Sequence, residues 1–355
     1  MLYIFYNIKL TIVVTLLIPP RWYFTAKMLP GACPFLQRVK NCLKSSLFEF
    51  PFAKPGNFAE HFSDMYNFFT RQLFTVVFMS LFAAAASAQE VKEPRTKPDW
   101  EQAYEPFRIA GNLYYVGTYD LACYLIVTPK GNILVNTGLA SSASQIKANI
   151  EKLGFNYKDI KILLLTQAHY DHMGAMAVIK KETGAKLYVD EKDADVLKTG
   201  GASDYEMGKY GMSFQPVTPD RLLKDNDKVK LGGTQLTLLH HPGHTKGSCS
   251  FMLTVKDEQR SWKVLIANLP SIIVDSSFDK VKTYPRIAAD YAYTLKAMKG
   301  LSFDIWVASH ASQFDLHTKH KPGDPYNPSA FADKAGYDTA LKELQADYDK
   351  KLKQQ

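Results

Sequence analysis

The chain has 355 residues, of which 46% are hydrophobic, and it carries a formal net charge of +8 at pH 7. The first 88 residues hold 8 of the 43 basic residues and 3 of the 35 acidic ones, which leaves +3 for residues 89–355. No cluster of Lys and Arg interleaved with aromatic residues stands out there, so we expect no nucleic-acid partner. This part of the chain is long enough for one large α/β domain with its own core.

A signal peptide is predicted at residues 65–88. A short, weakly basic lead precedes the apolar run Leu73–Ala86, which ends in Ala86-Ser87-Ala88, an Ala-x-Ala cleavage pattern. The run is shorter than the roughly 20 residues that span a bilayer, so we expect no stable membrane anchor after processing. The pattern therefore predicts export to the periplasm.

Residues 1–64 lie upstream of that signal peptide, where a secreted protein has no place for them. We interpret them as the product of an upstream start site, absent from the working protein. The alternative is a membrane-proximal extension, but its apolar segment, Leu10–Ile18, is too short to span. The expected organisation is an upstream extension at 1–64, a signal peptide at 65–88 and one domain at 89–355.

The domain is predicted to begin with an antiparallel meander. Its strands are three runs rich in β-branched and aromatic residues, Leu113–Val116, Ala122–Val127 and Ile133–Asn136. A glycine and a Pro-Lys-Gly turn separate them. A helix is then expected, capped by Ser141 or Ser142 and ended by Gly154.

Strands and helices then alternate along the chain. Further strands are predicted at Ile160–Leu165, Lys186–Val189, Gln235–Leu239, Ser248–Thr254, Val264–Ala267 and Phe303–Ala308. Helices are predicted at Ala175–Glu182, from Asp193, at Ala288–Met298 and in the amphipathic tail Phe331–Leu352, which we expect to pack on the outside. Residues 199–218 form a long loop, a feature that is usually functional or disordered. The pattern fits an α/β domain of layered sheets with helices outside.

Four side chains that can bind a metal ion lie within six residues, directly after the apolar run Ile162–Leu165. They are Gln167, His169, Asp171 and His172. Imidazoles and a carboxylate suit a borderline cation such as zinc. Side chains this close in sequence converge on one centre only if the backbone turns sharply, and we expect Gly174 to permit that turn.

Two distant histidines fit the same centre. His244 and His310 each follow an apolar, strand-like run of their own. Three strand ends that each deliver a histidine to one edge of a sheet form a constellation, which arises by chance far less often than a single histidine does.

This arrangement resembles the metallo-β-lactamase superfamily, whose hallmark is His-x-His-x-Asp-His followed by two distant histidines. The resemblance covers roughly residues 105–320. It implies a four-layer αββα sandwich, with the metal cleft at one edge of the two central sheets.

The resemblance also implies two neighbouring sites that hold one or two Zn²⁺ ions. His169 and His244 match two ligands of the first, and Gln167 stands where the superfamily usually has a third histidine. The second is matched completely, by Asp171, His172 and His310. Because an amide oxygen binds zinc more weakly than an imidazole does, we expect the second site to be the tighter one. The alternative is that Gln167 does not bind the metal.

This departure resembles the GOB-type enzymes of subclass B3 within the superfamily. Leu269 stands where other subclasses have a zinc-binding cysteine, and where glyoxalase II-like thioesterases use an aspartate to bridge two metals. The segment Ser309–His317 also resembles the subclass pattern. Asn136 occupies a position that is usually aspartate and that supports the ligand loop, so we expect altered ligand orientation.

The mechanism that the resemblance implies is attack of a zinc-bound hydroxide on the lactam carbonyl, with Asp171 as the catalytic residue that orients the nucleophile. Ser271 is expected to bind the substrate carboxylate, and Asn268 a carbonyl oxygen. The loop aromatics Tyr205, Tyr210 and Phe214 either cover the apolar face of the substrate or pack within the loop.

The leading prediction is a monomeric, periplasmic β-lactamase that hydrolyses penicillins, cephalosporins and carbapenems and thereby confers antibiotic resistance. The alternative is another exported hydrolase of the superfamily, a lactonase or a thioesterase. A zinc-binding protein without catalysis is disfavoured, because each ligand trio leaves a position for water. Cys123 and Cys249 lie in apolar runs and are expected to be buried, and the sequence leaves open whether they form a disulfide.

Overall fold

The computed structural model describes residues 12–13, 25–26, 91–94 and 96–354, and the chain divides into two compact units, Met1–Ser87 and Ala88–Gln355. The described residues of the first unit form one antiparallel pair of short strands, β1 (Ile12–Val13) and β2 (Thr25–Ala26). The predicted signal peptide lies outside the described residues, as does the rest of the predicted extension. Across the described part of the chain, we find no helix long and apolar enough to cross a membrane.

A seven-stranded sheet forms the first half of the second unit. In spatial order its strands are β3 (Phe107–Ala110), β4 (Leu113–Tyr115), β5 (Tyr124–Thr128), β6 (Gly131–Val135), β7 (Ile160–Leu164), β8 (Lys186–Asp190) and β9 (Arg221–Leu223). The strands from β3 to β6 are antiparallel, as the predicted meander requires, and those from β6 to β9 are parallel. The direction changes because helices connect the later strands and return the chain to the same end of the sheet.

A five-stranded sheet forms the second half. Its order is β10 (Lys228–Leu231), β11 (Thr234–His240), β12 (Cys249–Lys256), β13 (Ser261–Ala267) and β14 (Ile305–Ala308). The pairs β10–β11, β11–β12 and β12–β13 are antiparallel. β14 runs parallel to β13, because helix α8 (Ile287–Lys299) separates them in the chain.

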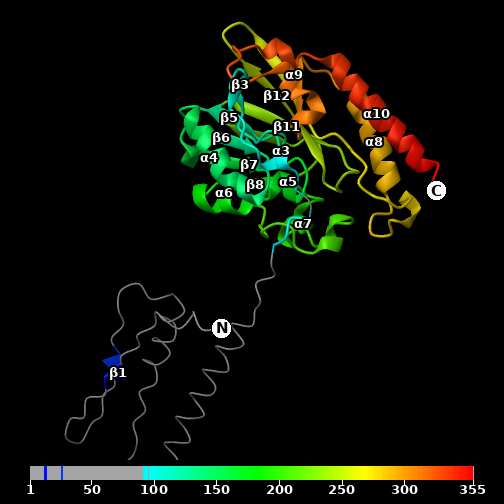
Figure 1. Cartoon of the computed structure of the whole chain (residues 1–355), viewed down its shortest axis with the longest axis horizontal. Helices are drawn as coiled ribbons and strands as arrows, with labels where there is room; N and C mark the ends of the chain where they lie inside the picture. The colour runs from blue at the N-terminus through cyan, green and yellow to red at the C-terminus, as the bar shows by residue number, and fades with distance from the viewer. Residues whose placement is uncertain (1–11, 14–24, 27–90, 95, 355) are drawn as a thin grey trace, which may run out of the picture. The chain divides into compact units, whose positions relative to one another are not determined.

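Helices cover the outer face of each sheet (Figure 1). α4 (Ala143–Lys152) and α6 (Met176–Thr183) pack on the seven-stranded sheet, and Ile150 and Ile179 belong to the apolar cluster between them. On the other side, α8 lies beside the long α10 (Lys334–Leu352), the tail helix predicted for the outer layer. The layers are helix, sheet, sheet and helix, which confirms the predicted αββα sandwich.

The main hydrophobic core lies between the two sheets. Ile162 and Leu164 of β7 point into it, together with Phe251 of β12 and Ile266 of β13. The intervening Leu163 faces the cluster under α4 and α6. β7 is therefore buried on both faces, as its continuous apolar run predicts, and it can present the residues that follow it at a rigid edge.

In the second unit, the sequence patterns missed three of the described strands, and each is an edge strand of its sheet. β3, β9 and β10 are three or four residues long. An edge strand pairs on one side only, and such short runs give no sustained alternation of apolar and polar residues.

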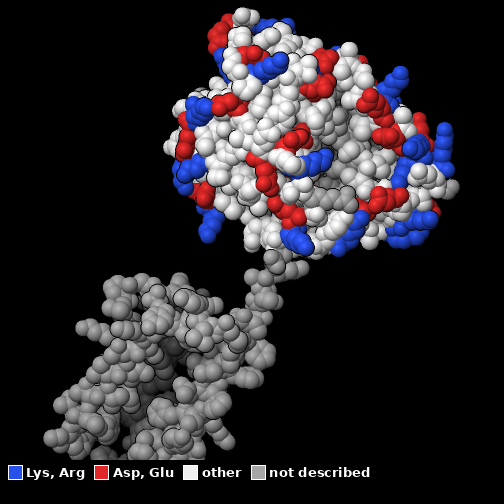
Figure 2. Space-filling view, in the orientation of Figure 1, with Lys and Arg blue, Asp and Glu red and all other residues white. Residues whose placement is uncertain are grey.

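Acidic and basic side chains are interspersed over the face shown in Figure 2. Cys123 and Cys249 are both buried, as expected, and both are free.

Candidate metal centre

Three chain segments converge at the edge of the sandwich. Residues 167–172 follow β7, His244 lies in the loop between β11 and β12, and His310 follows β14. An isolated antiparallel bridge pairs His310 with Leu121, which ties the last segment to the loop before β5. Other short helices nearby are α3 (Pro98–Glu101), α7 (Ala194–Lys198) and α9 (Leu316–Lys319).

Asp171 and His172 lie on α5 (Tyr170–Met173), a single helical turn that sequence reasoning missed. Gly174 ends this turn, but for a reason different from the one predicted. Its φ of −53° and ψ of −44° are ordinary helical values. A Cβ at this position would lie 2.4 Å from Ala140 N, so the close approach of the segment before α4 requires glycine here.

The predicted second site is assembled as one cluster. The possible ligand atoms of Asp171, His172 and His310 all lie within 4.8 Å of one another. Asp171 Oδ2 is 3.3 Å from His172 Nε2 and 3.4 Å from His310 Nε2. The two imidazole rings are nearly perpendicular, with centroids 4.9 Å apart. One carboxylate oxygen therefore faces two ring nitrogens in a buried place.

The predicted first site contains a pair of facing imidazoles. His169 Nδ1 lies 3.1 Å from His244 Nε2, and both residues are buried. Behind this pair, His244 Nδ1 lies 2.7 Å from Ser271 O and 3.2 Å from Ser271 Oγ. The other nitrogen of each ring is thus turned away from the pair.

Burial and local charge set the protonation of these groups. Burial, reinforced by the neighbouring His169, lowers the pKa of His244 to about 3. Burial opposes a charge on His310, but hydrogen bonds to Asp120 and Asp171 raise its pKa to about 9. Burial acts against the Asp171 carboxylate as well, but His172 and His310 hold its pKa well below the usual range. At neutral pH the centre therefore combines the Asp171 anion with a neutral His244, and a metal ion would have to displace a proton from His310.

Asp120 supports the second site and was missed by sequence reasoning. Its Oδ2 accepts hydrogen bonds from His310 Nδ1 at 3.1 Å and from Trp100 Nε1 at 3.1 Å, while Oδ1 accepts from Ser312 N at 2.9 Å. A carboxylate behind a histidine fixes the ring orientation and makes the opposite nitrogen a better ligand. The signal available in the sequence was a lone aspartate in the loop before β5, which no local motif distinguishes.

Asp193 supports the first site through hydrogen bonds to the segments that carry its two histidines, and sequence reasoning missed this role. The predicted helix start at this residue is confirmed, since α7 begins next to it, but its side chain is not a helix cap. Its Oδ2 accepts from Ala168 N at 3.0 Å and from Thr245 Oγ1 at 2.7 Å, and its Oδ1 accepts from Gly247 N at 2.7 Å. Asp193 therefore joins the backbone beside His169 to the loop that carries His244.

Asp204, from the long loop, approaches the same pair. Its Oδ2 lies 3.7 Å from His169 Nε2, and its Oδ1 accepts from the backbone N–H groups of Glu206 and Met207. Burial disfavours its charge, but His169 and these hydrogen bonds lower the pKa of Asp204. The long loop thus contributes a carboxylate to the centre, which supports a functional role for it.

Asn136 holds the start of the ligand loop in place. Its backbone is left-handed, with φ of 61°, a conformation that asparagine tolerates better than most residues. Its Oδ1 accepts from Thr166 N at 3.0 Å and from Thr166 Oγ1 at 3.1 Å. The amide oxygen thus performs the loop-supporting contacts expected at this position without a negative charge.

The remaining predicted residues are placed as follows. Gln167 is buried in the ligand loop, and Leu269 is buried in the core between the sheets. The Ser271 side chain is partly exposed beside His244. Asn268 is buried, with its Nδ2 donating to Thr166 O at 3.3 Å and its Oδ1 accepting from Ser309 Oγ at 3.3 Å. Its predicted contact with a substrate carbonyl stays a prediction, whereas its internal hydrogen bonds join three segments of the centre.

The aromatic residues of the long loop have different environments. Phe214 is fully buried in the core under α4 and α6, so it packs locally and offers no surface to a substrate. Tyr205 Oη donates to His244 O at 3.0 Å and to Gly243 O at 3.2 Å. Tyr210 is 38% exposed. Tyr205 therefore positions the His244 loop, and Tyr210 is the member of the trio with most surface.

The donor set fits zinc. Zinc binds imidazole nitrogen and carboxylate oxygen at about 2.0–2.2 Å in tetrahedral geometry, which places two ligand atoms about 3.3 Å apart. The separations between facing ligand atoms are 3.1, 3.3 and 3.4 Å. His172 Nε2 is also buried without a hydrogen-bond partner within the described residues, which is typical of a nitrogen atom that binds a metal ion.

Comparison with known proteins agrees with this geometry. The sequence profile of the metallo-beta-lactamase superfamily matches residues 118–259. Among curated proteins, the hydroxyacylglutathione hydrolase GloC of Haemophilus influenzae is 29% identical over 141 residues, which are 39% of this chain and 63% of that protein. The match therefore spans less than two thirds of that relative.

Solved structures match over more of the chain. The metallo-beta-lactamase GOB-18 from Elizabethkingia meningoseptica is 69% identical, with a TM-score of 0.75, and the match covers 76% of this chain and 100% of that one. The class B3 di-zinc metallo-beta-lactamase LRA-12 from an Alaskan soil metagenome is 65% identical, with a TM-score of 0.73, over 74% of this chain and 100% of that one. FEZ-1 from Legionella gormanii is 39% identical, with a TM-score of 0.66, over 71% and 97%. This chain therefore belongs to the metallo-β-lactamase superfamily and, within it, to subclass B3.

Proposed function

We propose that this protein is a zinc-dependent β-lactamase that opens the amide bond of penicillins, cephalosporins and carbapenems and so confers antibiotic resistance. The observation that carries the proposal is the buried cluster of Asp171, His172 and His310 beside the facing His169 and His244. It occurs in a chain that is 69% identical to a metallo-β-lactamase along that protein's whole length.

The two ligand groups would hold one or two zinc ions. His169 and His244, with Gln167, would form the first site, and Asp171, His172 and His310 the second. Bound zinc supplies a nucleophile from water near neutral pH and polarises the carbonyl that is attacked. The ligand atoms of these side chains lie in a largely buried place, where electrostatic interactions are stronger than in bulk water.

Asp171 has the main catalytic role among the side chains. Its carboxylate stays ionised because His172 and His310 stabilise the charge, so it accepts a hydrogen bond from the attacking water and orients it. His310 is in turn oriented by Asp120, so that its Nε2 points at Asp171. This arrangement would fix the direction of attack before the substrate binds.

Substrate contacts are proposed for Ser271 and Asn268. The Ser271 hydroxyl is partly exposed next to His244 and can donate to the carboxylate that β-lactams carry. Asn268 lies on the same strand exit, and a contact with a carbonyl oxygen would require its internal hydrogen bonds to break.

A lactonase or thioesterase is the alternative within the superfamily, and one position argues against it. Leu269 is buried and apolar where glyoxalase II-like thioesterases have a metal-bridging aspartate. Within the described residues, the cluster of possible metal ligands consists of Asp171, His172 and His310. It contains one carboxylate, that of Asp171, and no second aspartate that could bridge two metal ions. The donor set therefore favours the β-lactamase.

The test is zinc quantification coupled to turnover during stepwise metal addition. A chromogenic cephalosporin should be hydrolysed by the zinc-loaded protein and should not be hydrolysed after chelation. Cleavage of a lactone or a thioester without cephalosporin turnover would contradict the β-lactamase proposal and favour the lactonase or thioesterase.

We further propose that the protein is exported to the periplasm and acts there as a monomer without a membrane anchor. N-terminal sequencing of the exported protein should find a first residue near Gln89. Sedimentation should give the mass of one chain. A mature N-terminus near Met1 would contradict the processing.

A further inference from the structure

A tryptophan lies behind the carboxylate that orients His310. Trp100 belongs to α3 and is buried, and its Nε1 donates to Asp120 Oδ2 at 3.1 Å. The same oxygen accepts from His310 Nδ1 at 3.1 Å, so both of its lone pairs are used. The indole, the carboxylate and the imidazole therefore form one chain of hydrogen bonds that ends at a proposed zinc ligand.

The indole ring also contacts both segments that carry ligands of the second site. Its centroid lies 5.6 Å from that of the His310 ring, with the planes inclined by 43°. It lies 6.3 Å from the centroid of Tyr170, with the planes inclined by 54°. Tyr170 is the first residue of α5, the turn that holds Asp171 and His172. Trp100 thus packs against the two parts of the chain that have to meet at this site.

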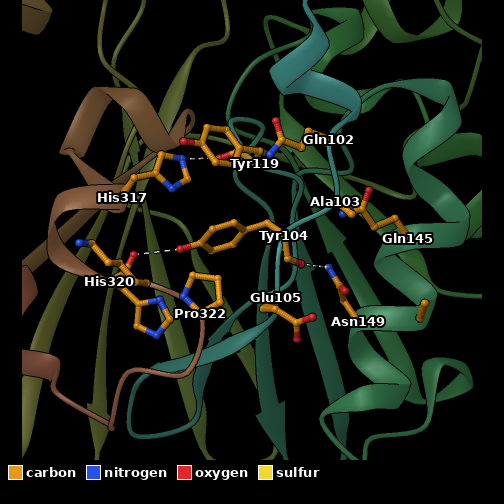
Figure 3. A pocket seen from close by; sticks show the side chains of 12 residues that line it. Gln102, Ala103, Tyr104, Glu105, Tyr119, Gln145, Asn149, His317, His320 and Pro322 are labelled. Carbon is orange, nitrogen blue, oxygen red and sulfur yellow. Dashed lines mark hydrogen bonds between the residues drawn. The ribbon is translucent and has the colours of Figure 1, made fainter.

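Backbone hydrogen bonds on both sides of Trp100 fix its position. Asp120 N donates to Asp99 O at 3.1 Å, and Tyr119 N donates to Gln102 O at 2.8 Å. Figure 3 shows Gln102 beside Tyr119 in the wall of a neighbouring pocket. Because the segment with the indole is bonded to the segment with the carboxylate, the two groups are held within hydrogen-bond reach.

The buried carboxylate of Asp120 needs the donor that the indole supplies. Without it, one lone pair of Oδ2 would lose its partner in a place that water does not readily enter. Such a loss on a buried charge costs free energy, and the carboxylate would turn toward another donor. That turn would misalign its hydrogen bond to His310. Indole suits the position because it offers one donor, no acceptor and no charge.

We propose that Trp100 is a positioning residue for the second zinc site, because it holds the Asp120 carboxylate in the orientation that His310 requires. The inference rests on the proposed zinc sites. The effect of Trp100 reaches His310 through Asp120, so the first site does not depend on it. Trp100→Phe is the informative variant, since phenylalanine keeps an aromatic ring and lacks the N–H.

Stepwise calorimetric titration with zinc tests the proposal. Trp100→Phe should weaken zinc at the second site about fivefold, less than removal of a carboxylate partner does, and should leave the first site unchanged. Trp262→Phe is the matched control. Its indole donates to Asp257 Oδ2 at 2.6 Å, in the hairpin between β12 and β13 and at the other end of β13 from Asn268.

The control should change neither zinc affinity. Three outcomes would overturn the proposal: an equal loss at both sites in Trp100→Phe, unchanged affinities in that variant, or the same loss at the second site in Trp262→Phe.

A double-mutant cycle separates the hydrogen bond from packing. In an Asp120→Ala background the indole has no carboxylate to hold, so Trp100→Phe should weaken the second site by less than about twofold more. A further loss of about fivefold in that background would show that the ring acts by packing alone, and the proposed role would be wrong.

A measurement without zinc distinguishes a failure here from a failure of the proposed function. In the metal-free protein, NMR follows the exchange of the His310 Nδ1 proton with solvent. This exchange should be several times faster in Trp100→Phe than in the natural chain and in Trp262→Phe. Equal rates in all three would refute the positioning role, even if the natural chain binds zinc. Zinc binding without cephalosporin turnover would count against the β-lactamase alone.

Discussion

The two halves of the metal centre are supported in different ways. In the second site, Asp171, His172 and His310 contact one another directly, and Asp120 holds His310 from behind through its ring nitrogen. In the first site, His169 and His244 face each other, but Asp193 reaches only the backbone and hydroxyl groups beside them.

This difference has a consequence for metal binding. A ligand ring that is hydrogen-bonded to a carboxylate is oriented and made more basic. In the first site, His244 Nδ1 instead faces the carbonyl oxygen of Ser271, and the nearest carboxylate oxygen to His169 Nε2, that of Asp204, is 3.7 Å away. Gln167 also stands at the position where the superfamily resemblance predicts a third imidazole for the first site. Both effects favour the second site, so the two sites should fill in order rather than together.

The largest effect is expected from Asp171→Asn. It removes the only carboxylate of the ligand cluster and the acceptor that orients the water, so kcat/KM for a chromogenic cephalosporin should fall by about 10³-fold. Asp195→Asn is the matched control, because that carboxylate is 86% exposed on α7. Retention of more than a tenth of the activity in Asp171→Asn would show that the second site does not direct the attack.

The carboxylates of Asp120 and Asp193 should each affect zinc binding at a different site of the metal centre. Asp120→Asn is expected to weaken zinc at the second site by about 10–100-fold, and Asp193→Asn to weaken zinc at the first by a similar factor. Stepwise calorimetric titration resolves the two affinities. If each variant weakened both sites equally, the separation of the two halves would be wrong.

Gln167→His should reduce the difference in zinc affinity between the two sites. A third imidazole is expected to raise the zinc affinity of the first site about tenfold and to leave the second unchanged. The same titration measures this, with the natural chain as the reference. Equal stepwise affinities in the natural chain would show that Gln167 imposes no penalty.

The smallest effect concerns stability and pH in the zinc-free protein. Burial opposes the Asp120 charge, but His310 and Ser312 lower its pKa, so its stabilisation is present above about pH 4 and is lost as the pH falls. Burial raises the pKa of Asp193 to about 6, so its ionisation costs stability that increases between about pH 4 and 6. In urea unfolding, the contribution of Asp120 to the unfolding free energy should therefore rise with pH, and that of Asp193 should fall.

The measurable quantity is the difference in unfolding free energy between each variant and the natural chain. The destabilisation by Asp120→Asn should grow as the pH rises from about 3 to 5, and that by Asp193→Asn should shrink between about 4 and 6, each by about 1 kcal/mol. Slopes of the same sign would show that the two carboxylates are in similar environments.

Much of the fold could be predicted because the central strands are long apolar runs. β7 buries Ile162, Leu163 and Leu164 in succession, and β12 buries alternate side chains from Phe251 on, so hydrophobic pattern alone locates both strands. The short edge strands such as β9 could not be found, because three residues give no period. Their pairing is decided by the neighbouring strand.

The ligand candidates could be named from sequence because their chemistry is uncommon and their spacing is local. Gln167, His169, Asp171 and His172 lie within six residues. The supporting groups Asp120 and Asp193 could not, since an isolated aspartate in a loop is most often solvated. Only the folded chain shows that these carboxylates are buried against ligand-bearing segments.

The bridge between Leu121 and His310 implies an order of events as the polypeptide matures. His310 is held by Asp120, 190 positions earlier in the chain. A partly synthesised chain can present His172 and Asp171, but it lacks the third donor until nearly the whole domain has emerged. Binding of a metal ion at Asp171, His172 and His310 would therefore be a late step, and a chain that ends before β14 would lack the third ligand.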